Sequence, residues 1–262
     1  MIAGARVAPD RSGGDRPPLI FVHGVGSTAA IWDYQLEPFS EHALCAAIEL
    51  RGNGAQKPDP DPSSITRGGF AEDVLTVADA LGAERFTIVG CSLGGVVAFE
   101  LWRRVPRRIA GMVLLGTFAR YPDGESTAQR ISAAVREAGD MRTFGKIRAE
   151  LLGLPPDRMR ETIEQMACKS VECYLASTQA TWTGDYRDVL PAIGVPVLVA
   201  HGEHDSVAPR ALSEEIASAI PGARLEMVEA AGHVANADSP VAFNRLLAGF
   251  LGTEPGRRRQ SK

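Results

Sequence analysis

The sequence has few cysteines and no long apolar run. Its four cysteines lack both the spacing of a zinc site and the density of a disulfide framework. No stretch approaches the roughly 18 apolar residues of a membrane-spanning helix, and the N-terminus has no signal-peptide pattern. These absences favour a reduced, cytoplasmic protein that makes no use of a membrane.

The charge balance argues against nucleic acid as a partner. The 262 residues carry a formal net charge of −4, which offers no electrostatic reason to bind nucleic acid. This length is common for one α/β domain with a sizeable buried core. The basic end of the chain, residues 252–262, is an exception, and we expect it to be a solvated, disordered tail.

One short glycine-rich stretch organises the chain, and it reads Gly90-Cys91-Ser92-Leu93-Gly94. The run before it is apolar and β-rich, and the run after it has helical character. A serine at so tight a strand-to-helix turn takes a strained backbone conformation with its hydroxyl exposed. Ser92 is therefore a candidate nucleophile, whereas Cys91 is expected to be a buried apolar residue. A glycine-rich turn that merely packs is the alternative.

Strands and helices alternate over most of the chain. Continuous apolar runs, typical of strands buried on both faces, cover residues 18–22, 43–48, 85–89, 109–116, 196–200 and 224–228. Helical spacing of apolar residues, as at Phe70, Val74 and Val77, fills the intervals. The alternation predicts an α/β fold with a mostly parallel central sheet, covered by helices on both faces and built from residues 1–117 and 191–251.

Residues 118–190 interrupt this alternation, because they contain no convincing strand and several amphipathic helical patterns. Since the block stands between two central strands, we expect it to form a helical cap over the carboxyl edge of the sheet. Such a cap would exclude water from a site at that edge. Phe118 and Trp182 are candidates to line the pocket beneath it. A helical subdomain that never touches substrate is the alternative.

Three residues whose side chains can act together in nucleophilic catalysis each follow a different predicted strand: Ser92, Asp205 and His233. The carboxyl ends of parallel strands share one edge, so these residues can converge. An imidazole activates a serine by taking its proton, and a buried carboxylate holds the tautomer of the imidazole. The chain order Ser, Asp, His is the order expected for this turn.

Neighbouring residues offer alternatives for the same roles. Glu203 is a second candidate acid, and His201 and His204 are further candidate bases. We favour Asp205 because it sits deeper in its loop, and His233 because its loop follows a separate strand. The same cluster raises the question of a metal site, but no separated second cluster completes one, so we expect no metal.

The loop after residues 18–22, His23-Gly24-Val25-Gly26, lies at the end of a predicted central strand. Its glycines let the backbone approach a ligand, and the N–H group of Val25 is a candidate donor to an oxyanion. We interpret His23 as a residue that holds this loop, since a better base comes later in the chain.

Together, these motifs resemble the α/β-hydrolase superfamily over residues 18–251. The matching motifs are Phe21-Val22-His23-Gly24, Arg51-Gly52-x-Gly54, Gly90-Cys91-Ser92-Leu93-Gly94-Gly95, Gly202-x-x-Asp205 and Gly232-His233. The resemblance implies a triad of nucleophile Ser92, acid Asp205 and base His233, with an oxyanion hole formed by the N–H groups of Val25 and Leu93. It also implies that residues 118–190 are the lid of the family.

Two positions depart from the family pattern, because many relatives carry Asp where Glu49 stands and Ser where Gln56 stands. The size of the chain, its single cap and the spacing of Trp32 look similar to small carboxylesterases and 3-oxoadipate enol-lactonases. Trp32 is therefore a further candidate for the substrate pocket.

The functional hypothesis is a serine hydrolase that cleaves a small ester or lactone through an acyl-enzyme, without a cofactor. Three alternatives remain open, because a fold does not determine a reaction. The same triad serves C–C bond hydrolases, lyases and cofactor-independent oxygenases. The second alternative is a ligand receptor that hydrolyses its ligand slowly, and the third is a non-catalytic scaffold.

Overall fold

The computed structural model describes residues 4–14, 16–54, 60–152 and 156–253. Most of the predicted basic tail lies outside these ranges, and so does Gln56. Within them, no helix has both the length and the apolar character that crossing a membrane would require.

In the described residues, seven strands form one sheet with the order β1-β3-β2-β4-β5-β6-β7. Only the edge strand β1 runs antiparallel to its neighbour, whereas the other five pairings are parallel. The strands are β1 (Ala5–Val7), β2 (Leu19–Val22), β3 (Cys45–Ile48), β4 (Phe86–Cys91), β5 (Ile109–Leu115), β6 (Val197–Gly202) and β7 (Arg224–Val228). The predicted mostly parallel sheet is confirmed.

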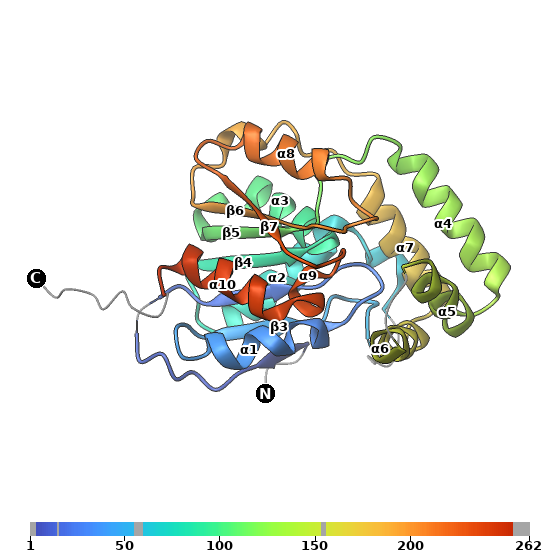
Figure 1. Ribbon diagram of the computed structural model, residues 1–262, viewed down its shortest axis with the longest axis horizontal. Helices are drawn as coiled ribbons and strands as arrows, with labels where there is room; N and C mark the ends of the chain where they lie inside the picture. Colours follow the sequence, from blue (N-terminus) through green and yellow to red (C-terminus); the bar gives the residue numbers. More distant parts are fainter. Residues whose placement is uncertain (1–3, 15, 55–59, 153–155, 254–262) are drawn as a thin grey trace, which may run out of the picture.

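Helices cover both faces of this sheet (Figure 1). They are α1 (Asp33–Phe39), α2 (Arg67–Ala80), α3 (Leu93–Arg104), α8 (Arg210–Ala219), α9 (Ala235–Asp238) and α10 (Pro240–Leu251). Side chains of a strand alternate between faces. Ile20 and Val22 therefore pack into the core shared with α2, α3 and α8, whereas Leu19 and Phe21 pack into the core shared with α1, α9 and α10.

Between β5 and β6 the described residues form four α-helices: α4 (Gly124–Ala138), α5 (Met141–Leu151), α6 (Pro156–Ala167) and α7 (Val171–Trp182). We call them the helical insertion. Asp140 accepts a hydrogen bond from the Thr143 N–H at 2.9 Å at the start of α5, and Ser170 caps α7 in the same way. Figure 1 shows the helical insertion gathered beside the sheet, beyond one end of its strands. It falls within the residues 118–190 for which a cap is predicted.

The turn between β4 and α3 requires glycine at Gly94, and this generates a prediction about stability. A Cβ atom at Gly94 would overlap the backbone carbonyl of Val22 on the central strand β2. We expect Gly94→Ala to lower the free energy of unfolding by about 3 kcal/mol, the upper end of the usual cost of overpacking, because two central elements must move apart. Urea denaturation measures this loss.

Gly82→Ala is the matched control. Gly82 has a positive φ of 66°, but a Cβ atom there would have no neighbour within 4 Å. Only backbone strain remains, and we expect it to cost about 1 to 2 kcal/mol. Equal urea midpoints for the two variants would contradict the steric explanation.

Candidate active site

Ser92 stands in the turn between β4 and α3 with a backbone conformation that residues other than glycine rarely adopt. Its φ is 53° and its ψ is −112°. A Cβ atom at Gly90 would overlap the backbone at Gly94, so both neighbours must be small for the chain to turn here. The side chain of Ser92 consequently projects from the carboxyl end of β4, and Leu93 begins helix α3.

Asp205 and His233 form a buried pair beyond the ends of β6 and β7. Nδ1 of His233 lies 2.8 Å from Oδ2 of Asp205, whose side chain is fully buried. Oδ1 of Asp205 accepts hydrogen bonds from the N–H groups of Val207 at 2.8 Å and Ala208 at 3.0 Å. Both carboxylate oxygens are thus satisfied, and Nδ1 of His233 carries the proton that it shares with Asp205.

The pKa of Asp205 reflects a balance of opposing effects. Burial alone would raise it, because a desolvated carboxylate loses its hydration. The hydrogen bond and positive charge of His233, together with the two backbone N–H groups, outweigh burial and hold the pKa of Asp205 below its ordinary value. Asp205 is therefore ionised at neutral pH and holds His233 in one orientation.

The fold brings Ser92 next to this pair. The N–H of Ser92 donates to the carbonyl of Leu115 at 2.9 Å. Leu115 is the last residue of β5, and Gly116 follows it. A Cβ atom added to Gly116 would lie 3.1 Å from Oδ2 of Asp205 and 3.2 Å from Nδ1 of His233, so the Asp–His pair lies against the end of this strand. Among the described residues, no hydrogen bond joins Oγ of Ser92 to another protein atom.

The alternative acid and the alternative bases make other contacts. Glu203 is half-exposed and accepts a hydrogen bond from the Ala230 N–H at 3.1 Å. His204 is largely exposed beside Glu203. His201 is buried against Oγ of Ser213 at 3.0 Å, and burial lowers its pKa, which keeps it neutral. Asp205 is thus the carboxylate that contacts His233.

The loop after β2 lies against Ser92. A Cβ atom at Gly24 would be 3.2 Å from Cβ of Ser92 and 3.8 Å from its Oγ. His23 is fully buried and holds this loop, since its Nδ1 lies 2.8 Å from the Gly24 carbonyl and its Nε2 accepts from the Leu50 N–H at 3.2 Å. Within the described residues, the N–H groups of Val25 and Leu93 have no hydrogen-bond acceptor.

Glu49 extends the same support. One of its carboxylate oxygens accepts a hydrogen bond from the Ala29 N–H at 3.3 Å. The other has no hydrogen-bond partner among the described residues, since Nε2 of His23, 3.3 Å away, is itself an acceptor. Glu49 therefore braces the loop on which Val25 stands.

Burial raises the pKa of the Cys91 thiol, so the neighbour of Ser92 is an inert apolar residue. In the ranges that the structure describes, no group of three or more His, Cys, Asp and Glu side chains is placed to hold a metal ion.

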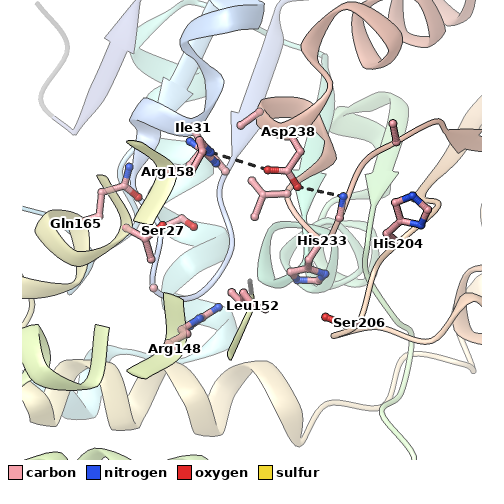
Figure 2. A pocket seen from close by; sticks show the side chains of 16 residues that line it. Ser27, Ile31, Arg148, Leu152, Arg158, Gln165, His204, Ser206, His233 and Asp238 are labelled. Atoms are coloured by element: carbon pink, nitrogen blue, oxygen red, sulfur yellow. Dashed lines mark hydrogen bonds and ion pairs between the residues drawn. The ribbon is translucent and has the colours of Figure 1, made fainter. Parts of the chain in front are cut away.

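Two pockets open between the helical insertion and the carboxyl edge of the sheet. The first, of about 400 Å³, mixes charged and polar side chains with apolar ones; because it is the more polar of the two, we call it the polar pocket (Figure 2). His233, His204 and Ser206 border it from the core, and Arg148, Arg158 and Gln165 from the helical insertion. The second, of about 340 Å³, is apolar and is bordered by Val25, Ile131, Phe144, Trp182 and Val207 among others. Arg148 and Leu152 border both pockets.

The three predicted pocket residues have different surroundings. Trp182 borders the apolar pocket. Phe118 is buried beneath it, with its ring 5.3 Å from that of Trp182. Trp32 does not lie at the site, because it is fully buried on the other side of the sheet, with ring centroids 5.2 Å from Phe21 and 6.1 Å from Phe243. An apolar side chain of this size gains more from the core than from a pocket.

The sequence analysis missed Arg148, which nevertheless carried a signal. It stands four residues after Phe144 and therefore on the inward face of α5. A charged residue on the apolar face of an amphipathic helix is a candidate for contact with a ligand.

Comparisons with known proteins give a consistent result. A family model described as alpha/beta hydrolase fold matches residues 17–240. The chain is 28% identical to 3-oxoadipate enol-lactonase 2 of Acinetobacter baylyi over 90% of this chain and 89% of that protein. It is 27% identical to carboxylesterase YbfK of Bacillus subtilis over 90% of this chain and 81% of that protein. A solved hydrolase structure from Pseudomonas aeruginosa is similar with a TM-score of 0.82 and 31% identity, over 95% of this chain and 93% of that one.

The pair of Asp205 and His233 generates a prediction about acid stability. Because the pKa of Asp205 is lowered by folding, its carboxylate stabilises the fold above its ordinary pKa of 3.8, and this contribution is lost as the pH falls below that value. Asp205→Asn should therefore lose less stability than the wild type between about pH 5 and about pH 2. Urea unfolding at each pH measures the difference.

Glu203→Gln serves as the control, because the Glu203 carboxylate is half-exposed and does not contact His233. We expect this variant to follow the wild type across the acid range. If Asp205→Asn also followed the wild type, the interpretation of the buried pair would be wrong.

Proposed function

The chain belongs to the α/β-hydrolase superfamily, and from that premise we propose that it is a serine hydrolase that cleaves a small ester or lactone. Ser92 is the nucleophile, His233 the base and Asp205 the acid. One observation carries this proposal: a strained serine stands beside a buried His–Asp pair at the carboxyl edge of the sheet. Relatives named as a carboxylesterase and an enol-lactonase support the choice of bond.

The reaction follows from the roles of these groups. Oγ of Ser92 attacks the substrate carbonyl carbon as Nε2 of His233 takes the hydroxyl proton. The carbonyl electrons move to oxygen, where the N–H groups of Val25 and Leu93 stabilise the oxyanion. When the tetrahedral intermediate collapses, His233 returns the proton to the leaving oxygen and an acyl-enzyme remains. Water, activated by the same imidazole, then releases the acid.

The helical insertion has the role of a cap in this proposal. Its helices border both pockets together with residues of the core, so a bound substrate is enclosed between the two. Exclusion of water strengthens the electrostatic stabilisation of the oxyanion. No step requires a cofactor or a metal, and the cytoplasmic location stays a prediction.

A fluorophosphonate probe tests the proposal, because it labels an activated serine without requiring the natural substrate. We expect the wild type to be labelled, and Ser92→Ala and His233→Ala to fail, since the first lacks the nucleophile and the second the base. Mass spectrometry of the labelled peptide identifies the modified residue. Circular dichroism confirms that each variant is folded.

His204→Ala separates the two candidate bases. Loss of labelling in this variant, with retention in His233→Ala, would overturn the assignment of the base. A folded wild type that does not react would favour the receptor or scaffold alternatives. Labelling together with an inert panel of esters and lactones would point to a C–C hydrolase, a lyase or an oxygenase.

A further inference from the structure

The two pockets receive different parts of the substrate. In the proposed reaction His233 must reach the leaving oxygen to return its proton, so the leaving group lies in the pocket that His233 borders. The acyl group then occupies the other pocket, which Val25 borders and which contains no member of the triad. The acyl side is therefore almost wholly apolar, whereas the leaving-group side carries charged and polar groups among apolar ones.

Arg148 is placed to act on the leaving group. Its side chain is half-buried and comes from α5, on the opposite side of the polar pocket from His233 (Figure 2). Its Nη1 donates a hydrogen bond to Oη of Tyr174 at 2.8 Å. A Cβ atom on Gly26, one residue beyond Val25, would lie 2.7 Å from this same Nη1. The guanidinium therefore lies directly against the loop beside Ser92.

The charge of Arg148 has no counterpart in the described residues, since no carboxylate there lies within 4.0 Å of it. Arg158, the other arginine of this pocket, is paired with Glu161 at 2.5 Å and lies 3.9 Å from Asp238. Asp238 also borders the pocket, where burial raises its pKa and Arg158 partly offsets that effect. Of the two arginines that border this pocket, Arg148 is thus the one without a carboxylate within 4.0 Å in the described residues.

The half-buried guanidinium of Arg148 loses hydration, and until an anion binds only the hydrogen bond to Tyr174 offsets that loss. Arginine presents a planar fork of N–H groups that matches a carboxylate, and one Nη1 bond to Tyr174 leaves other donors free. Tyr174 also fixes the orientation of this fork before a ligand arrives. The site is therefore organised for a carboxylate at the end of the leaving group.

We propose that the substrate is an ester or lactone with an apolar acyl group and a leaving group that carries a carboxylate, which Arg148 binds. This inference rests on the proposed function, and it names a substrate class within that function. Arg148 is then the residue that determines specificity for the leaving group.

The test uses two hexanoate esters that share the acyl group and differ by one charge. Their leaving phenols are 3-hydroxybenzoate and 3-hydroxybenzamide. We expect the wild type to prefer the carboxylate ester by about 10- to 100-fold in kcat/KM, the range of a charge-assisted hydrogen bond. Arg148→Met should lose most of this preference, chiefly through a higher KM, and added salt should reduce it in the wild type.

Two controls make the comparison specific. Arg136→Met removes the same charge from an exposed position on α4 and should keep the preference. Phenyl hydrogen glutarate and phenyl glutaramate place the same charge difference on the acyl side. Because Arg148 also borders that pocket, these esters decide which of the two pockets its guanidinium serves, and we expect no preference between them that depends on Arg148. The opposite result would be that Arg148→Met loses activity toward phenyl hydrogen glutarate and keeps its activity toward the 3-hydroxybenzoate ester. That result would reverse the assignment of the pockets and overturn the proposal.

Binding measurements separate this inference from the proposed function. Calorimetry should detect 3-hydroxybenzoate binding to the wild type and binding weaker by about 10-fold or more to Arg148→Met, whether or not any ester is cleaved. If Ser92 reacts with the fluorophosphonate but the charged and neutral ligands bind equally, the inference fails and the hydrolase assignment stands. If Ser92 does not react, the hydrolase assignment fails, and calorimetry still decides the role of Arg148.

Discussion

The site depends on the backbone conformation of Ser92. A non-glycine residue at φ 53° stores strain on the order of 1 to 3 kcal/mol, and the surrounding bonds hold it there. Its N–H donates to Leu115, and its carbonyl accepts both the Thr117 hydroxyl at 2.7 Å and the Gly95 N–H at 2.9 Å. Because strand β5 and helix α3 tie down both sides of this one residue, the hydroxyl has a defined position toward His233. Any loosening of the turn would displace the nucleophile and the Leu93 N–H together.

The parallel sheet supplies the remaining groups from the same edge. Strands β2, β4, β6 and β7 are followed by Val25, Ser92, Asp205 and His233 respectively. Strand β5 contributes Gly116, whose missing side chain leaves room for the contact between Asp205 and His233. The order of the strands in the sheet thus brings together residues that are far apart in the sequence, and in this way an α/β chain assembles a site from distant segments.

The sequence predicts the elements and the chemistry better than the orientation of individual side chains. Continuous apolar runs identify six of the seven strands, because strands buried on both faces leave a clear pattern. Ser92, Asp205 and His233 are found in the same way, since each follows such a strand. Trp32 shows the limit, because its spacing does not reveal that Phe21 and Phe243 enclose its ring in the core. The pairing of Arg158 with Asp238 joins elements far apart in the chain, and no local pattern encodes it.

The two arginines of the polar pocket illustrate a physical distinction between structural and ligand-binding charge. Arg158 is neutralised by Glu161 on its own helix and approaches Asp238 on α9, which in turn accepts from the Gly232 N–H at 3.2 Å. This chain of contacts connects the helical insertion to the loop that carries His233. Arg148 faces the same space with no carboxylate partner in the described residues. An anion bound between Arg148 and His233 therefore bridges the helical insertion and the core. The leaving group is then bound at the same contacts between insertion and core that position the catalytic base.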